Sequence, residues 1–318
     1  MNKFHKPIII IISIVGMLVN GWAQPDPKIL AKTNVSVLLQ LADQYELQFQ
    51  NEYAAAVIWA QSNGIPMKII TANGNIIELV GIRNNEPIYY GADNLNAAKT
   101  TATNKIQAGG SSNLDLTGDG ITLGIWDQGK VRDTHQEFGS RVTLVDNSGS
   151  YDWHATHVSG TMIASGVVNN AKGMATEAAL KSWNWSLDYS EMAAASATGL
   201  ILSNHSYGIT SGWNYDENND WRWYGNINIS TNEDYKFGFY NSTAETWDNV
   251  AFNAPYYLIV KSAGNDRNDT GPSSGGAHYH GNGTTVYYDS HDPDGGSNGF
   301  DCISTNVVAK NILSVGAG

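Results

Sequence analysis

The stretch that decides the fold reads ITLGIWDQG over residues 121–129 and, a short distance further on, DWHATHVSGTMIAS over residues 152–165. The first part is an apolar run that ends at Asp127, which predicts a buried strand with a carboxylate at its carboxyl end. The second part predicts a helix over residues 157–164, with His154 at its mouth and small residues that let it lie close to a sheet. A buried strand followed by such a helix is typical of a parallel sheet.

Short apolar runs alternate with helical patterns through the rest of residues 120–318. The expected strands cover residues 121–126, 142–145, 178–183, 201–204, 256–260 and 312–315. The expected helices cover residues 157–164, 189–200 and 244–253. This alternation predicts an α/β fold in which helices cover both faces of a parallel sheet. Sites in such sheets form at the carboxyl ends of the strands, so the residues after each run are the candidates for chemistry.

Residues 24–96 have a different pattern, that of a small α+β module. A long helical pattern ends at Asn63-Gly64, which is a typical helix end. Two strands, over residues 67–71 and 76–80, flank Asn73-Gly74, a strong signal for a two-residue hairpin. We interpret the module as a propeptide, although it could also be an ordinary N-terminal domain that stays attached.

Residues 97–119 separate this module from the larger domain. They are polar, rich in Gly, Ser and Thr, and lack a sustained hydrophobic period. This composition indicates a linker and the region where a propeptide would be processed.

The first 23 residues have the pattern of a secretory signal peptide. Lys3 and Lys6 supply the positive start, an apolar run covers residues 8–19, and small residues at positions 21 and 23 predict cleavage before Gln24. The alternative is a membrane anchor, but the run is shorter than the roughly 20 apolar residues that span a bilayer. We therefore expect a secreted protein without a stable membrane anchor.

Composition and charge narrow the class of protein. The chain has 318 residues, of which 42% are hydrophobic and 15% charged, as is typical of a soluble globular protein. Its net charge of −12 repels phosphate backbones, so we expect no nucleic acid as a partner. Cys302 is the single cysteine, which excludes an internal disulfide, and we interpret it as a small buried hydrophobe.

Two residues at strand and helix junctions are candidates for chemistry. Asp127 could orient a histidine, although an aspartate after a strand often only begins a turn. His154 could be that histidine. An alternative is a metal-dependent hydrolase in which His154, His157 and Asp127 bind a metal, but two histidines without a carboxylate at suitable spacing make a poor zinc site.

The residues around both positions resemble the subtilisin family of serine peptidases. DQG at residues 127–129, together with His135 and Phe138, is similar to the family's aspartate motif. HATHVSGT at residues 154–161 is similar to its histidine motif, usually HGTHVAGT, and the two departures exchange one small residue for another. The first histidine of that motif is the catalytic one, which selects His154. The resemblance implies a subtilisin-like parallel sheet.

Two further segments extend the resemblance in the same order along the chain. SNHSYG at residues 203–208 is similar to the family's substrate-edge segment, whose backbone pairs with an extended peptide. KSAGN at residues 261–265 is similar to the segment that lines a specificity pocket and ends in the oxyanion-hole asparagine. The implied substrate-binding residues are Ser206, Tyr207, Gly208, Ser262, Ala263 and Gly264. The implied catalytic residues are Asp127, His154 and Asn265.

The family's triad also needs a serine, which lies in a G-T-S-x-A segment after the asparagine. Residues 266–318 contain no such segment, so we expect the serine beyond Gly318 and an incomplete catalytic domain over residues 120–318. The resemblance implies an exported serine endopeptidase that acts on polypeptides, requires no cofactor for catalysis, and is inhibited by its own propeptide. The alternative is a catalytically inactive subtilisin-like module that binds glycans or surface proteins through the Trp- and Tyr-rich residues 212–240.

Two acidic loops are candidates for structural calcium. Oxygen-rich loops suit Ca²⁺, and exported subtilisin-like enzymes often use it for stability. Neither loop has the spacing of an EF-hand. The candidates are Asp216, Glu217 and Asp220 in one loop and Asp292, Asp294 and Asp301 in the other.

Overall fold

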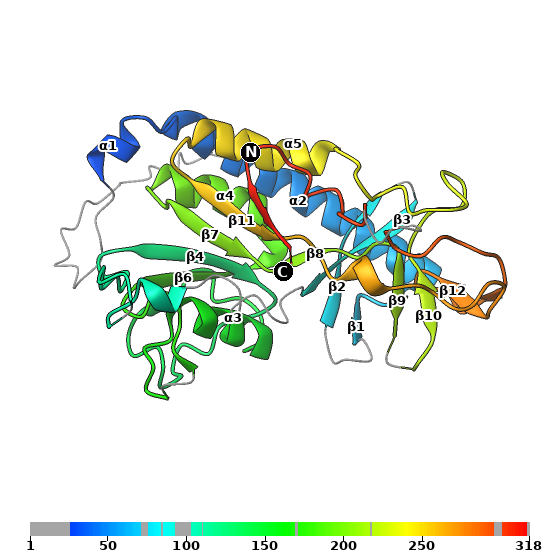
Figure 1. Cartoon of the computed structure of the whole chain (residues 1–318). Coiled ribbons are helices and arrows are strands. Elements are labelled where there is room, and N and C mark those ends of the chain that lie inside the picture. The colour runs from blue at the N-terminus through cyan, green and yellow to red at the C-terminus, as the bar shows by residue number, and fades with distance from the viewer. Residues whose placement is uncertain are drawn as a thin grey trace, which may run out of the picture.

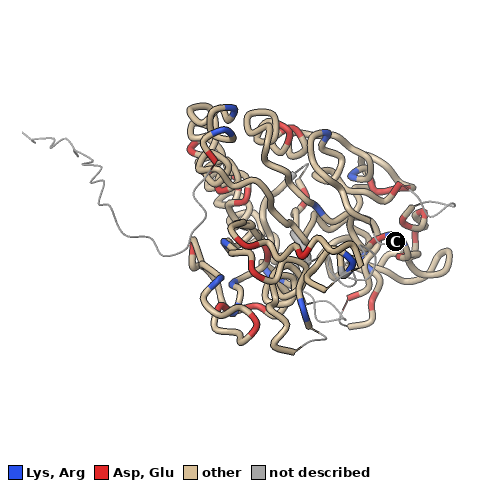
Figure 2. Tube along the Cα trace, turned by 60° about the vertical axis from the view of Figure 1, so that its left-hand side comes forward, with Lys and Arg blue, Asp and Glu red and all other residues tan. Residues whose placement is uncertain are grey.

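The computed structural model describes residues 26–70, 76–83, 85–92, 103–109, 111–168, 171–216, 218–295 and 301–316. The expected signal peptide and the expected turn at Asn73-Gly74 lie outside the described residues. Within the described part of the chain, no helix combines the length and the apolar character needed to cross a membrane. The acidic and basic residues of the described part of the chain are spread over the tube in Figure 2, and in that view they single out no one surface.

A six-stranded parallel sheet occupies the left-hand part of the molecule in Figure 1. Its strands lie in the order β14 (Leu313–Val315), β11 (Leu258–Ser262), β7 (Leu202–His205), β4 (Thr122–Asp127), β6 (Ala179–Asn184) and β5 (Val142–Leu144). Every neighbouring pair is parallel. Each strand overlaps one of the six expected runs, so the predicted α/β fold with a parallel sheet is confirmed.

Helices cover both faces of this sheet (Figure 1). Helix α3 (Trp153–Ile163) lies on one face. Helices α4 (Asp188–Ala197) and α5 (Ser242–Asn253) lie on the other, and the long α2 (Val35–Asn63) packs on them. The helices lie where the pattern predicts them, except that α3 begins at Trp153 rather than at residue 157.

Strand β4 contributes side chains to both layers of the core. Leu123 and Ile125 pack with Val158 of α3. Trp126 points to the opposite face and belongs to the cluster of Trp247 in α5. This alternation is the two-residue period of a strand, and it makes β4 apolar on both sides.

Helix α2 belongs to the main core, although its segment reads as a separate module in the sequence. Leu38, Ala42 and Tyr45 are buried in the same cluster as residues of α4 and α5. The helix ends at Gly64, whose φ of 66° is the left-handed conformation that glycine adopts without strain. The expected helix end at this position is therefore confirmed.

The N-terminal strands form an antiparallel sheet with a strand of the larger domain. β1 (Lys68–Ile70) pairs with β2 (Ile76–Arg83), as predicted. A third strand, β3 (Glu86–Ala92), was not predicted and pairs with β2 on one side. On its other side β3 pairs with β8 (Tyr207–Ile209), which directly follows β7. This sheet joins strands β1 to β3 to the segment that follows β7.

A small third sheet contains β13 (Val286–Tyr287), β12 (His278–His280), β10 (Trp221–Trp223) and β9 (Trp213–Tyr215), in that order. Trp213 and Trp223 are buried in it. Trp213 and Trp223 pack on His278, His280 and His291, so the two tryptophans lie inside this part of the protein rather than on its surface. Single helical turns occur at α1 (Pro27–Leu30), η2 (Thr103–Lys105), η4 (Trp185–Leu187) and η5 (Asp266–Asn268).

Candidate active site

The register of the parallel sheet brings the candidate segments to one edge. Trp126 of β4 lies opposite His205 of β7, and His205 lies opposite Lys261 of β11. One residue further along each of these three strands come Asp127, Ser206 and Ser262. The three segments that the sequence singles out therefore meet at the carboxyl edge of the sheet, where sites of such folds form.

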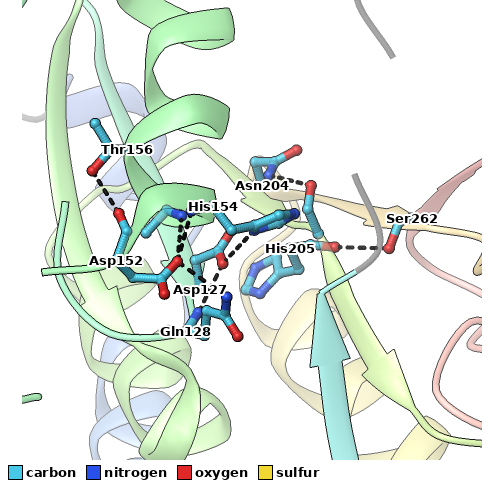
Figure 3. A network of polar contacts seen from close by, with 10 residues as sticks. Asp127, Gln128, Asp152, His154, Thr156, Asn204, His205 and Ser262 are labelled. Atoms are coloured by element: carbon cyan, nitrogen blue, oxygen red, sulfur yellow. Dashed lines mark hydrogen bonds and ion pairs between the residues drawn. The ribbon is translucent and has the colours of Figure 1, made fainter. Parts of the chain in front are cut away.

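Asp127 and His154 form a direct contact at this edge (Figure 3). His154 Nδ1 lies 2.7 Å from Asp127 Oδ1, and each residue is only 1% exposed. Helix α3 presents the histidine from its first turn, because Asp152 caps the helix by accepting hydrogen bonds from the backbone N–H groups of His154 (2.7 Å) and Ala155 (3.2 Å). This cap is the physical reason why α3 starts earlier than the apolar pattern alone predicts.

The surroundings of Asp127 suit a group that orients a histidine. Its Oδ1 atom also accepts the backbone N–H of Gln128 at 2.8 Å. Burial raises the pKa of the Asp127 carboxyl, and the hydrogen bond from His154 opposes that shift. Because Asp127 Oδ1 accepts the backbone N–H of Gln128, it also serves as the acceptor toward His154 Nδ1, so the imidazole proton lies on Nδ1 and Nε2 of His154 keeps its lone pair. The pair thus holds one imidazole as a potential base.

His157 faces a different part of the molecule. It is exposed and lines a cavity of about 780 Å³ together with His135 and Phe138. Neither Asp127 nor His154 lines that cavity. Among the described residues, the ligand atoms of Asp127, His154 and His157 do not form a group that could hold a metal ion. The geometry therefore does not support a metal-dependent hydrolase at these residues.

The expected substrate edge is covered by another strand of the chain. Tyr207 and Gly208 lie in β8 and are buried, as is Ser206 beside them. Tyr207 lies opposite Ala92 and Gly208 opposite Gly91, in antiparallel pairing with β3. The backbone edge that the sequence assigns to a substrate peptide is therefore occupied in this structure by residues 90–92.

The segment after β11 forms an irregular, partly open loop. Ser262 Oγ donates a 3.4 Å hydrogen bond to the backbone carbonyl of His205, and the N–H of Ala263 donates to Val315 O at 2.8 Å. Gly264 has a φ of 105°, a conformation that side-chain-bearing residues rarely adopt. Asn265 is exposed, and its side chain makes no capping hydrogen bond to η5. Its amide is therefore not used to cap that helix.

A buried polar network behind the edge was missed in the sequence. Lys261 is fully buried in β11, and its Nζ donates to the backbone carbonyls of Tyr207 and Ser262. The Tyr207 hydroxyl donates to Asp188 Oδ2 at 2.7 Å and lies 3.0 Å from His205 Nδ1. Burial, aided by the charge of Lys261, holds the pKa of His205 well below its usual range. A lysine inside the apolar run LIVKS was the signal that could have revealed this network.

Of the two acidic loops, the one that contains Asp294 does not form the group that the sequence suggested. Asp216 forms an ion pair of 2.6 Å with Arg222. Asp294 lies near Asp266 and Asp269, rather than in a cluster with Asp292 and Asp301. Glu217 lies outside the described residues. Structural calcium remains an expectation from the sequence.

Comparisons with known proteins give little further information. No model of a known protein family matches the chain, and no curated protein matches it. One solved structure that it resembles is the crystal structure of the epidermin leader peptide processing serine protease from Staphylococcus aureus, at 17% identity and a TM-score of 0.32. The match covers 56% of this chain and 46% of that chain, and a similarity this low carries no weight for the function.

Proposed function

We propose that the protein is an exported serine endopeptidase of the subtilisin type, and that this chain holds its N-terminal module and the first part of its catalytic domain. The buried contact between Asp127 and His154 carries the proposal. It joins the two residues that the motifs single out, it lies at the carboxyl edge of a parallel sheet, and it leaves His154 Nε2 as the basic nitrogen.

In the proposed reaction a serine supplied by residues after Gly318 attacks the carbonyl carbon of the peptide bond. His154 Nε2 takes the serine proton as the C–O bond forms, and Asp127 stabilises the imidazolium. The amide of Asn265 donates a hydrogen bond to the resulting oxyanion. When the C–N bond breaks, His154 gives its proton to the leaving amine, and water then releases the acyl group from the serine. No step requires a cofactor.

The position of β3 supports two partner assignments. Polypeptide substrates would bind by adding a strand along Tyr207 and Gly208, because backbone hydrogen bonds accept many side-chain sequences. Residues 90–92 occupy this edge here. That occupancy supports residues 24–96 as a propeptide that inhibits the enzyme until a cut within residues 97–119 releases it. Signal removal after residue 23 would deliver the protein outside the cell.

The proposal is tested with the protein expressed from its complete gene. We expect the wild type and His157→Ala to hydrolyse an unfolded substrate such as reduced, alkylated casein, because His157 faces another cavity. We expect His154→Ala to lose activity by a factor of roughly 10⁶, the size of loss known for subtilisin itself. Activity of His154→Ala close to that of the wild type would refute the proposal. A wild type that binds glycans but hydrolyses nothing would favour the inactive binding module.

A further inference from the structure

Four side chains of the third sheet converge on one point. His278 and His280 are two residues apart in β12, so their side chains project from the same face of the strand. Asp289 and His291 follow β13 and approach that face. Each of the four residues offers one ligand atom, and all four of these atoms lie within 4.8 Å of one another.

Four of the distances between these atoms are close to the ligand separations of a tetrahedral metal site, and the other ligand atoms lie within 4.8 Å of one another. Asp289 Oδ1 lies 3.1 Å from His278 Nε2, and Asp289 Oδ2 lies 3.4 Å from the Nε2 atoms of both His280 and His291. The Nε2 atoms of His280 and His291 are 3.3 Å apart. Ligands at 2.0–2.1 Å from a tetrahedral zinc ion are separated by about 3.3–3.4 Å, so an ion fits with little movement.

Backbone carbonyls fix which nitrogen of two rings is free. His291 Nδ1 lies 2.7 Å from Thr231 O, and His278 Nδ1 lies 3.0 Å from Gly276 O. A carbonyl can only accept a hydrogen bond, so both rings carry a proton on Nδ1. Their Nε2 lone pairs therefore point into the cluster. This is the usual arrangement of histidines that bind a metal.

The contacts inside the cluster call for a cation. With its proton on Nδ1, His278 presents an acceptor to the carboxylate of Asp289, which is also an acceptor. Accordingly, His278 Nε2 is buried and has no hydrogen-bond partner of suitable geometry, although Asp289 Oδ1 is only 3.1 Å away. Two facing acceptors are unfavourable unless a positive charge lies between them.

Aromatic rings hold the imidazoles in place. Trp223 stacks on His291 with 3.5 Å between ring centroids and an angle of 4°. Tyr287 stacks on His280 at 4.0 Å, and the edge of Trp213 contacts His278 at 5.0 Å. Ligands whose rotamers are fixed in this way need little ordering when a metal binds.

The geometry points to a zinc site formed by His278, His280, Asp289 and His291. Three imidazole nitrogens and one carboxylate oxygen suit Zn²⁺, and four protein ligands leave no open position, as in structural zinc sites. The ion would tie β12 to the loop after β13, and Thr231 would anchor this site through His291. The site lies in a different sheet from Asp127 and His154, so it does not depend on the peptidase proposal.

The first test measures zinc in the purified protein by elemental analysis after dialysis against micromolar Zn²⁺. We expect about one zinc ion per chain in the wild type and less than about a tenth of that in His280→Ala and Asp289→Asn. The matched controls Asp292→Asn and His157→Ala should keep the full amount. Full zinc in His280→Ala, or loss of zinc in His157→Ala, would overturn the assignment, and the latter would favour a metal at His154 and His157.

The second test does not require any variant to fold. Removing zinc from the wild type with a chelator should lower its Tm, and returning Zn²⁺ should restore it in a concentration-dependent manner. Co²⁺ added to the zinc-free protein should produce the visible absorption of tetrahedral cobalt. A wild-type chain that takes up neither ion, and whose Tm does not respond to chelator, would show that there is no zinc site.

Discussion

Asp127 at the end of β4 and His154 in the first turn of α3 are separated by 27 residues, yet their side chains meet through a 2.7 Å contact that water does not reach. A third residue, Asp152, supports the contact. Its carboxylate caps the N-terminus of α3 and so fixes the position of His154 in the first turn of the helix. The strand end, the cap and the pair together place one imidazole with a defined tautomer at the edge of the sheet.

Asp127→Asn should reduce the kcat of the complete protein for a peptide substrate by about 10⁴, the loss that this exchange causes in other serine peptidases. An amide can donate to Nδ1, which moves the imidazole proton to Nε2 and removes the base. Asp133→Asn in the same loop is the matched control, and its kcat should stay close to that of the wild type. Steady-state kinetics of the three proteins give the answer, and a kcat of Asp127→Asn within tenfold of the wild type would contradict the assigned role.

Asn265→Ala should lower kcat by about 10²–10³, the effect established for loss of the oxyanion donor in subtilisin. The side chain is exposed and does not cap η5, so the Tm of this variant should equal that of the wild type. Asn268→Ala, in the same helical turn, is the control and should keep both kcat and Tm. If both variants lose activity equally, the turn as a whole matters and Asn265 has no special role.

Glu191 makes the stability of the fold depend on pH. Burial raises the pKa of its carboxyl from 4.5 to about 8, while the Trp126 indole donates to it at 3.0 Å. The folded chain therefore retains a proton that the unfolded chain releases. This contribution to stability is complete below about pH 4 and is lost as the pH rises through 8.

Glu191→Gln removes this dependence, because an amide oxygen can still accept the indole N–H. The difference in Tm between the variant and the wild type should grow in favour of the variant from pH 5 to pH 9, as measured by calorimetry. Glu52 is exposed on α2, so Glu52→Gln serves as the control. Its difference in Tm from the wild type should stay the same from pH 5 to pH 9. A difference for Glu191→Gln that does not change with pH would show that its carboxyl is ionised in the folded chain.

Leu38→Ala tests whether α2 is part of the main core. Leu38 is fully buried among residues of α4 and α5, so its truncation should lower the free energy of unfolding of this chain by about 2–5 kcal/mol. Its neighbour Leu39 is 48% exposed, so Leu39→Ala should change the free energy of unfolding little. Urea unfolding of both variants measures the difference. Equal midpoints would mean that α2 folds apart from the sheet and its helices.

The parallel sheet could be predicted because its strands are buried on both faces. Runs such as residues 121–126 are apolar throughout and are separated by helical patterns. Few folds other than a parallel sheet covered by helices have this pattern. The contact between Asp127 and His154 could also be anticipated from their motifs. The predicted start of α3 was wrong because an apolar pattern contains no information about a helix cap. In the structure, Asp152 caps the helix by accepting hydrogen bonds from its first N–H groups.

Features that depend on distant pairing were harder to predict. Strand β3 contains Pro87, which weakens a strand pattern, and its partner Tyr207 lies far along the chain. The proposed zinc ligands lie in a Gly-rich region with few hydrophobic residues. Hydrophobic periodicity therefore does not predict strands there. The spacing of His278 and His280 was the usable clue, because two histidines at alternate positions of a strand share a face.

The central claim is that His154 acts as the base for a serine nucleophile, and labelling with a fluorophosphonate tests it most directly. The reagent reacts with activated serines, so the complete protein, freed of its N-terminal module, should be labelled on one serine after Gly318. His157→Ala should be labelled like the wild type, and His154→Ala should not be labelled. An unlabelled wild type, or equal labelling of His154→Ala, would contradict the claim.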